Sequence, residues 1–309
     1  MGTVIQSTEE QMKVSVLMPT YNHEPYIAQA IESFLAQQCD FAVELLIGND
    51  ASTDNTLEIA RQYAASNPER IKLIDHKTNI GLLRNYKSLI DIAQGEYFAI
   101  LESDDYWIDP LKLQKQVDFL DQHPSYGISY TQYQRLRDGV LSSRKEDTEV
   151  LSIHANNLYE RFLLRNIIKS PTVCFRRSMF ERYCNLDDYI QHGFRTFDFP
   201  VWLSLIRHSN IHYIPTPTSV YRFVSSSISN SSDLNKKLDF EANVIKIRRY
   251  LISKYGSGRL SIYQIVNRET IVKGRYAYRS KEFLTSLGIF IRGFVGNGLN
   301  YVKKEILQF

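Results

Sequence analysis

The first 110 residues alternate between short apolar runs and helical patterns, and this alternation limits the possible folds more than any other feature. Runs rich in β-branched residues predict strands at residues 14–18, 43–48, 71–74 and 97–101. Apolar residues at helical spacing predict one helix in each interval, and Ser52 or Thr53 is expected to cap the second helix. Strands that alternate with single helices form parallel sheets through right-handed crossovers. We therefore expect an α/β fold whose central sheet is mainly parallel and flanked by helices.

Polar residues follow every predicted strand, at the sheet edge where α/β proteins bind their ligands. Glu102, Asp104 and Asp105 come directly after the strand at 97–101. Alternate residues of an extended chain face the same way, so Glu102 and Asp104 can share one site. Clustered carboxylates repel each other unless a cation compensates them, and Mg²⁺ or Mn²⁺ suits such oxygen ligands. The spacing alone supports a solvated acidic turn equally well.

The loop after the second predicted strand contains two further carboxylates, Asp50 and Asp54. Asx turns and helix capping account for Asp54. Asp50 ends an apolar strand, where a carboxylate without a partner is costly. The sequence contains neither GxGxxG nor GxxxxGK[ST], so neither a dinucleotide-binding fingerprint nor a P-loop explains this sheet.

Four ordered motifs carry a resemblance to a known family. They read PTYN at 19–22, NDASTDN at 49–55, NIGLLRN at 79–85 and GEYFAILESDDYW at 95–107. In this order and at this spacing they resemble the family 2 glycosyltransferases of the GT-A fold, of the type that makes bacterial cell-surface polysaccharides. The resemblance covers residues 13–225. It implies a nucleotide-diphosphosugar donor, commonly UDP-linked, and inversion at the anomeric carbon.

The resemblance places the nucleotide end of the donor at the first three motifs. Thr20 and Asn22 would lie at the nucleotide. Asp50 would bind the uracil imide, and Arg84 would lie near the base or the diphosphate.

The fourth motif is expected to contact the ribose and the metal. Asp104 and Asp105 match the family's acidic metal-binding motif, and Asp104 is the preferred ligand. Glu102 stands where the family usually has an aspartate, as Asn49 does in the second motif. The longer side chain of Glu102 leaves open which of the three carboxylates ligates the metal.

Asp198 is the candidate general base. Sugar transfer needs a stabilised leaving group and a base that takes the proton of the acceptor hydroxyl. That base must lie opposite the diphosphate, so a later segment should provide it. The segment RTFDFPVW at 195–202 resembles the family's later acidic motif. The alternative role for Asp198 is the cap of a helix that opens at Pro200, and Asp187 and Asp188 are weaker candidates for the base.

Two further segments have counterparts in the family. Tyr221 and Arg222 resemble a motif in a loop that closes over the diphosphate, where Arg222 would bind phosphate oxygens. Val224 stands where related enzymes often carry a histidine, and an ordinary surface arginine is the alternative for Arg222. Residues 165–172 resemble the stretch that lines the acceptor side.

Charge is distributed unevenly along the chain. Residues 245–309 carry a net charge of +10 and residues 1–244 a net charge of −7, although the whole chain carries only +3. The region 283–309 combines an apolar helical face with basic residues, a pattern typical of helices on an anionic membrane surface. A helix packed on the catalytic domain or on a partner subunit is the alternative. No apolar run is long enough to span a bilayer.

The same features predict the domain organisation. We expect an N-terminal tail at 1–12, a GT-A catalytic domain at 13–225 and a basic, amphipathic helical extension at 226–309. The polar segment 225–233 marks the last boundary. Three cysteines without metal-ligand spacing, and an N-terminus unlike a signal peptide, favour a cytoplasmic protein. It would be peripheral at the inner membrane face if the tail binds there.

The predicted reaction is metal-dependent, inverting transfer of a sugar from a nucleotide sugar to a hydroxyl of a glycan or lipid-linked acceptor. A sugar nucleotidyltransferase is one alternative, but it needs a Gly-rich loop with Arg and Lys after the first strand. The sequence PTYNHE at 19–24 lacks such a loop. A catalytically inactive nucleotide- or sugar-binding module is the second alternative. The small net charge gives no indication of a nucleic-acid partner.

Overall fold

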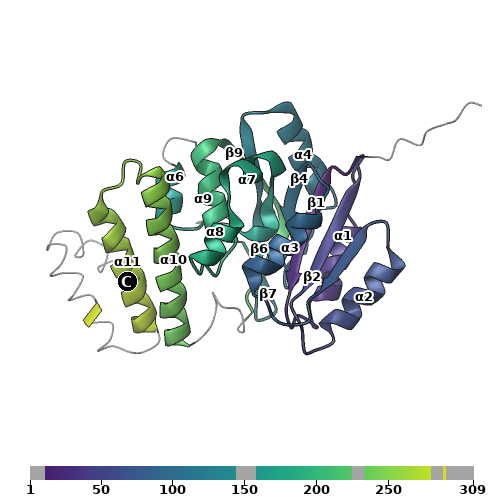
Figure 1. Ribbon diagram of the computed structural model, residues 1–309, viewed down its shortest axis with the longest axis horizontal. Helices are drawn as coiled ribbons and strands as arrows, with labels where there is room; N and C mark the ends of the chain where they lie inside the picture. Colours follow the sequence, from purple (N-terminus) through teal and green to yellow (C-terminus); the bar gives the residue numbers. More distant parts are fainter. Residues whose placement is uncertain (1–10, 144–157, 225–232, 280–287, 290–309) are drawn as a thin grey trace, which may run out of the picture.

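The computed structural model describes residues 11–143, 158–224, 233–279 and 288–289. Within these residues one nine-stranded sheet runs through the molecule, with helices on both faces (Figure 1). The strands are β1 (Val14–Thr20), β2 (Val43–Asn49), β3 (Ile71–Asp75), β4 (Tyr97–Ile100), β5 (Tyr106–Trp107), β6 (Tyr126–Arg137), β7 (Val140–Ser142), β8 (Val173–Arg176) and β9 (Asn210–Arg222). The sheet order is β3-β2-β1-β4-β8-β6-β9-β5, and β7 pairs with β6.

The helices of the first half are α1 (Ile27–Leu35), α2 (Thr56–Ser66), α3 (Leu82–Ile92) and α4 (Lys112–Gln122). The second half contains α6 (Leu158–Leu164), the 3₁₀ turn η1 (Ser170–Thr172), α7 (Arg177–Tyr183), α8 (Leu186–Gln191), α9 (Asp198–His208), α10 (Leu234–Tyr255) and α11 (Ile262–Arg279).

The first half forms the parallel sheet that the alternating pattern predicts. β1 pairs in parallel with β2 and β4, and β2 pairs in parallel with β3. The predicted capping of the second helix is wrong, because α2 begins at Thr56 after Asn55 and has no side-chain cap. Asp54 accepts the hydrogen bond from the Thr56 amide instead. Ser52 and Thr53 lie too far before the first helical turn to cap it.

Alternating side chains of β1 build the core on both faces of the sheet. Val14, Val16 and Met18 pack with residues of α1, α2 and α4 on one face. Leu17 packs on the other face with residues of α3, α7 and α9. All four side chains are fully buried, and each contributes about 1.5–3 kcal/mol through burial. A one-residue slip of β1 would exchange the two faces, so this pattern fixes where the strand ends.

The second half of the sheet is mixed. β8 runs antiparallel to both β4 and β6, while β9 runs parallel to β6 and antiparallel to β5. Strand β9 was not predicted, because Pro215 and Pro217 within it are typical of breaks in a strand. The register between β6 and β9 shifts near these prolines, which accommodates them. Tyr221 and Arg222 therefore end a strand rather than lying in a loop, contrary to the sequence-based expectation.

Helices α10 and α11 form an antiparallel pair at the end of the molecule opposite α1 and α2 (Figure 1). Ile247 and Leu251 of α10 join the core cluster that contains Trp202 of α9. None of the described helices combines the length and apolar character that a membrane span requires. The polar segment at 225–232 and, apart from 288–289, the amphipathic region 283–309 lie outside the described residues. The predicted domain limits stay predictions.

Candidate active site

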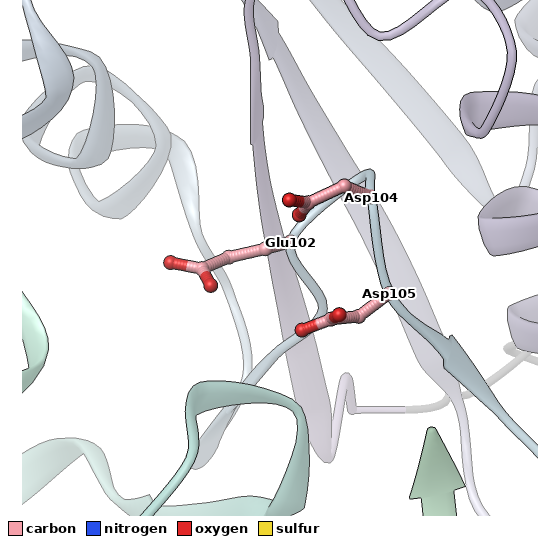
Figure 2. Close-up of side chains that lie close together, drawn as sticks. All are labelled: Glu102, Asp104 and Asp105. Atoms are coloured by element: carbon pink, nitrogen blue, oxygen red, sulfur yellow. The ribbon is translucent and has the colours of Figure 1, made fainter. Parts of the chain in front are cut away.

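The acidic turn, Glu102–Asp105, follows β4 and brings three carboxylates together (Figure 2). One oxygen from each of Glu102, Asp104 and Asp105 lies within 4.8 Å of the others. Asp105 is only 1% exposed, and its Oδ1 accepts a hydrogen bond of 2.7 Å from the Arg222 amide. Its Oδ2 is buried and has no hydrogen-bond partner among the described residues. The turn thus presents oxygen ligands, one of them unsatisfied.

Burial and mutual repulsion shift the pKa values of these carboxyls upward. Burial, assisted by the charges of Asp104 and Asp198, raises the pKa of Glu102 to about 8. Burial, followed by the charges of Asp104 and Glu102, raises the pKa of Asp105 well above its usual range. A further positive charge would relieve this repulsion, and hard divalent cations prefer oxygen ligands of this kind. The residues therefore fit a divalent metal ion.

Arg222 holds the acidic turn from the end of β9. Its Nη1 donates to the Asp104 carbonyl oxygen, and its Nη2 donates to Gln29 Oε1 over 2.6 Å. The guanidinium carbon lies 4.6 Å from the centroid of the Tyr26 ring. Together with the hydrogen bond from the Arg222 amide to Asp105, these contacts place the Arg222 charge beside the three carboxylates.

Thr20, at the end of β1, is tied to the acidic turn through Ser103. Ser103 Oγ donates to Thr20 Oγ1 over 2.8 Å, and His23 Nδ1 lies 2.7 Å from the same Oγ. All of Ser103 and nearly all of Thr20 is buried. Two neighbouring strand ends are thus joined side chain to side chain. The sequence indicated Thr20 but not its partners Ser103 and His23.

Asn22 links the loop after β1 to the loop after β2. Its backbone lies in the left-handed region with φ 54°, which asparagine tolerates better than most residues. Its Oδ1 accepts from the Thr53 amide over 2.8 Å, and its own amide donates to Ser52 Oγ. Asp54 Oδ2 similarly accepts from the Glu24 amide over 3.1 Å. These contacts give both residues a structural role in the described chain.

Asp50 is buried at the end of β2, and the start of α3 supplies its partners. Oδ1 accepts from the Ile80 amide over 2.7 Å, and Oδ2 accepts from the Gly81 amide over 3.0 Å. This carboxylate therefore satisfies amides at the helix N-terminus, where the helix dipole also favours negative charge. Arg84 lies exposed in the first turn of α3, with one long bond of 3.4 Å from Nη1 to the Ile80 carbonyl. Among the described residues, no hydrogen bond or ion pair joins Arg84 to the acidic turn.

Asp198 is the first residue of α9 rather than its cap, because Phe197 occupies the cap position. Asp198 Oδ1 accepts from the Phe199 amide over 2.7 Å, and Oδ2 accepts from Asn166 Nδ2 over 2.6 Å. These two bonds fix the orientation of the half-buried carboxylate. The Oδ1 of Asn166 is buried without a partner among the described residues.

Tyr86 of α3 connects Asp198 to the acidic turn. Its ring stacks on that of Phe197 with centroids 4.0 Å apart, and its hydroxyl donates to Glu102 Oε1 over 3.4 Å. The charges of Glu102 and Asp198 both add to the effect of burial, which raises the pKa of Tyr86 well above its usual value. The two carboxylate groups, distant in sequence, therefore belong to one site.

Lys169, just before η1, places a cation on this side of the site. Its Nζ lies 4.6 Å from the centroid of the Tyr221 ring. Burial lowers its pKa, while the charges of Asp198, Asp105 and Glu102 act in the opposite direction. The segment 165–172 was expected to line the acceptor side, but Lys169 itself was not singled out. Nothing in its local sequence indicates that distant carboxylates surround it.

A buried polar network lies beneath the site. Lys112 of α4 has no exposed surface, donates to Gln116 Oε1 over 2.7 Å and lies 4.6 Å from the centroid of the Trp107 ring. Gln116 Nε2 donates to the carbonyl oxygens of Ser129 and Thr172. Burial lowers the pKa of Lys112 to about 7. The network supports both the chain after the acidic turn and η1.

The arrangement combines three chemical capabilities. The acidic turn can hold a divalent cation, and Arg222 adds a fixed positive charge beside it. Asp198 offers a second carboxylate with a fixed orientation, and Phe197 and Tyr86 lie between it and Glu102. A cation site for an anionic leaving group and a separate carboxylate for proton removal are the parts that group transfer to a hydroxyl requires.

Sequence comparisons agree with this geometry. A family model described as "Glycosyl transferase family 2" matches residues 15–185, a range that includes the acidic turn and ends before Asp198. An uncharacterized protein of Mycobacterium tuberculosis, Rv1520, is 35% identical over 232 residues, 74% of this chain and 64% of that protein. The chain thus spans less than two thirds of that relative. Bacillus subtilis TuaG, named as a teichuronic acid biosynthesis glycosyltransferase, is 32% identical over 71% of this chain and 82% of TuaG.

Two solved structures share the fold. S. aureus TarS, crystallised with UDP-GlcNAc, has a TM-score of 0.60 at 20% identity, covering 91% of this chain and 81% of that one. The mannosyltransferase PcManGT from Pyrobaculum calidifontis, in complex with GDP-Man and Mn²⁺, has a TM-score of 0.61 at 15% identity, covering 96% and 79%. These similarities confirm the predicted GT-A fold with its mainly parallel sheet.

Proposed function

This chain belongs to glycosyl transferase family 2, and on that premise we propose that it is an inverting sugar transferase. It would move a sugar from a nucleotide-diphosphosugar, UDP-linked by preference, to a hydroxyl of a glycan or lipid-linked acceptor. The structural neighbours are complexes with UDP-GlcNAc and with GDP-Man, which supports a donor of this class. A hexose or a hexose derivative is the sugar expected from these two donors.

One observation carries the proposal: the acidic turn and Asp198 meet in one site although they lie on distant segments. Tyr86 links the two: its hydroxyl donates to Glu102, and its ring stacks on Phe197, the residue before Asp198. A nucleotide-binding module has no need for a second, separately oriented carboxylate at this point. A transferase needs one to accept the proton of the incoming hydroxyl.

The metal site of the proposal consists of Asp104, Asp105 and Glu102, with Mg²⁺ or Mn²⁺ as the ion. The buried, unpartnered Oδ2 of Asp105 and the raised pKa values of Asp105 and Glu102 support this assignment. The structural neighbour PcManGT is a complex with Mn²⁺. When bound, the ion would stabilise the leaving diphosphate as a Lewis acid.

The remaining donor contacts are proposed from the positions of five side chains. Thr20 and Asn22 lie at the end of β1, next to the acidic turn and the β2 loop. Asp50 keeps one lone pair on each oxygen after binding two amides, so it can also accept from a uracil imide. Arg84 makes only one long bond and can reach a phosphate or a base. Arg222 would bind the diphosphate beside the metal.

Asp198 is the proposed general base. Its carboxylate is oriented by Asn166 and by the Phe199 amide, so one geometry is presented to the acceptor hydroxyl. The proton of that hydroxyl moves to an Asp198 oxygen as the oxygen attacks the anomeric carbon, and the bond to the diphosphate breaks. The positive charge of Lys169 interacts with Asp198 and with the carboxylates of the acidic turn, and it limits their mutual repulsion before substrate binds.

The proposed setting is the cytoplasmic face of a cell membrane, with the helical region 226–309 as an extension of a catalytic domain at 13–225. The +10 charge of residues 245–309 and the amphipathic pattern at 283–309 support contact with anionic lipids. The name of TuaG refers to teichuronic acid biosynthesis, which supports a polymer acceptor. Flotation of the full chain with anionic liposomes at low salt tests the membrane contact, and failure to float refutes it.

The function itself is tested by titrating the full chain with UDP and Mn²⁺ in a calorimeter and then measuring nucleotide release from UDP-GlcNAc and GDP-Man. Metal-dependent binding followed by release supports a transferase. Binding without release, unaltered by Asp198→Asn, indicates an inactive module. Formation of a nucleotide sugar from a sugar phosphate and a nucleoside triphosphate indicates a nucleotidyltransferase. Absence of any nucleotide binding refutes the proposal.

A further inference from the structure

Helix α10 contacts the turn that leads into Asp198. Asn243 Oδ1 accepts from the Arg195 amide over 2.9 Å, and Asn243 Nδ2 donates to the Gly193 carbonyl oxygen over 2.8 Å. One side chain of α10 thereby satisfies a donor and an acceptor on opposite sides of the turn at 193–195. Asn243 is 8% exposed, so water competes little for either bond.

From this geometry we propose that Asn243 is a positioning residue for Asp198, and that α10 is therefore a working part of the catalytic apparatus. The inference rests on the proposed function of Asp198 as the base. It assigns a catalytic purpose to a helix that lies outside the range of the family match.

Further contacts of α10 close the same turn. Arg195 forms an ion pair with Asp239 of α10. Phe194, which is buried, packs against Tyr250 of α10 with ring centroids 5.3 Å apart. The turn itself needs Gly193, which has φ +62°, a region that other residues adopt at a cost. The turn is thus held by the two hydrogen bonds of Asn243, an ion pair and an aromatic contact, all from one helix.

The position of the turn passes directly to Asp198. Only Thr196 and Phe197 separate Arg195 from Asp198, and both are buried. The ring of Phe197 is fixed against Tyr86 of α3, which in turn contacts Glu102. A chain held at Arg195 by α10 and at Phe197 by α3 leaves Asp198 little freedom. Catalytic groups misplaced by a fraction of an ångström to 1 Å lose rate, which makes such holding effective.

The experiment compares two variants that disturb the turn from different sides. Asn243→Ala removes both hydrogen bonds from α10. Gly193→Ala strains the turn from within through its φ of +62°, and it causes no clash, because the added Cβ would meet only Lys246 Nζ at 3.7 Å. Metal-dependent nucleotide release from UDP-GlcNAc or GDP-Man, whichever the unaltered chain uses, is measured with the Kd for UDP and Mn²⁺. We expect kcat to fall about tenfold in both variants, with KM for the donor and the Kd unchanged.

Ser253→Ala is the matched control, since Ser253 is an exposed α10 residue that bonds only to the Tyr250 carbonyl oxygen. It should leave kcat and KM as they are. Asn243→Asp keeps the acceptor for the Arg195 amide and should recover part of the lost kcat. The inference is overturned if the variants bind UDP and Mn²⁺ normally and keep full kcat, or if KM rises instead. If the unaltered chain releases no nucleotide, the proposed function is refuted. This first measurement therefore separates failure of the proposed function from failure of the inference about Asn243.

Discussion

The two halves of the site are built in different ways. On the donor side, Thr20, Asn22 and Asp50 lie at or just after the ends of parallel strands. They are fixed by short hydrogen bonds to the loops that follow neighbouring strands. On the base side, Asp198 is held by groups from separate elements: Asn166 beyond α6, Tyr86 with Phe197, and Asn243 of α10 through the preceding turn. The parallel sheet positions the donor side, whereas the base side depends on contacts between segments that are distant in the sequence.

The difference extends to buried polar atoms. Among the described residues, Asn166 Oδ1, Thr196 Oγ1 and Trp202 Nε1 are buried without partners around the base. Asn85 Oδ1 and Asp105 Oδ2 are the comparable atoms near the donor loops and the acidic turn. Each such atom costs about 1–3 kcal/mol, and folds retain them mostly where function requires it. The base side therefore carries more of the stability cost of the site, and substitutions should separate the two halves.

Replacing Asp198, the proposed base, should give the largest effect. Asp198→Asn keeps the size of the side chain and an oxygen for the Phe199 amide but removes proton acceptance. We expect kcat for nucleotide release to fall about a thousandfold, because general-base catalysis contributes about 10²–10⁴. The Kd for UDP with Mn²⁺ should stay unchanged, since the donor side is built independently. Steady-state kinetics and calorimetry measure the two quantities.

Asp187→Asn is the matched control for this prediction. Asp187 was a weaker candidate for the base, and it lies on α8 within 3.6 Å of Lys87 Nζ. The control should lose less than twofold in kcat. A larger loss in Asp187→Asn than in Asp198→Asn would show that the base had been assigned to the wrong carboxylate.

Removing one proposed metal ligand should give the second largest effect. Asp105→Asn keeps Oδ1 for the Arg222 amide and replaces the unpartnered Oδ2 with an amide nitrogen. Metal-dependent nucleotide release should fall about a hundredfold, with most of the loss in the affinity for Mn²⁺. Metal titrations of activity measure this, and Asp118→Asn, an exposed change on α4, is the control. Unchanged Mn²⁺ dependence in Asp105→Asn contradicts the metal site.

The sequence predicted the donor side of the site better than the base side. The four parallel strands and the acidic turn were predicted correctly, because each signal lies within a few consecutive residues. Asp104 and Asp105 could be found from the strand that precedes them. The partners of Asp50 could not, since the amides of Ile80 and Gly81 carry no side-chain signal.

On the side of the proposed base, the sequence indicated Asp198 and, without singling out a residue, the segment 165–172. Lys169 and Asn166 became visible only once η1, α9 and β9 had been brought together. Strand β9 itself was missed, since its prolines conceal it. Asn243 lies in a helix that the sequence showed only as helical and basic. Long-range packing decides these contacts, and no periodicity or spacing in one segment encodes it.

A substitution of Asp50, on the donor side, should reduce the stability of the fold. Asp50→Ala leaves the amides of Ile80 and Gly81 without their carboxylate partner. We expect a loss of about 2 kcal/mol in the free energy of unfolding, the cost of unsatisfied amides at a helix N-terminus. Urea denaturation measures this loss. Asp91→Ala, an exposed change on α3, the helix that begins after Ile80 and Gly81, should cost less than about 0.5 kcal/mol. Equal effects of the two would show that Asp50 is not a structural anchor.

The smallest effect concerns Lys112, whose network joins the two halves beneath the site. Burial lowers its pKa to about 7 in the folded chain, against about 10.4 when unfolded. Between these values the unfolded chain binds one proton more than the folded chain, so this lysine's contribution to stability rises with pH. Below pH 7 both states are protonated, and the full penalty of a buried charge remains. The stability of the unaltered chain relative to Lys112→Met should therefore increase by about 1 kcal/mol per pH unit from pH 7 to pH 9.

Taking the difference between the two proteins removes the other titrations, above all that of Glu102, whose raised pKa makes stability fall as pH rises towards 8. Lys115→Met is the control, because Lys115 is a surface residue of the same helix whose ion pair with Asp109 is partly exposed. Its difference from the unaltered chain should not vary over this pH range. A flat difference for Lys112→Met would mean that Lys112 stays charged in the folded chain. The network that joins the two halves would then contain a buried cation, and the halves would be coupled by charge rather than by neutral hydrogen bonds.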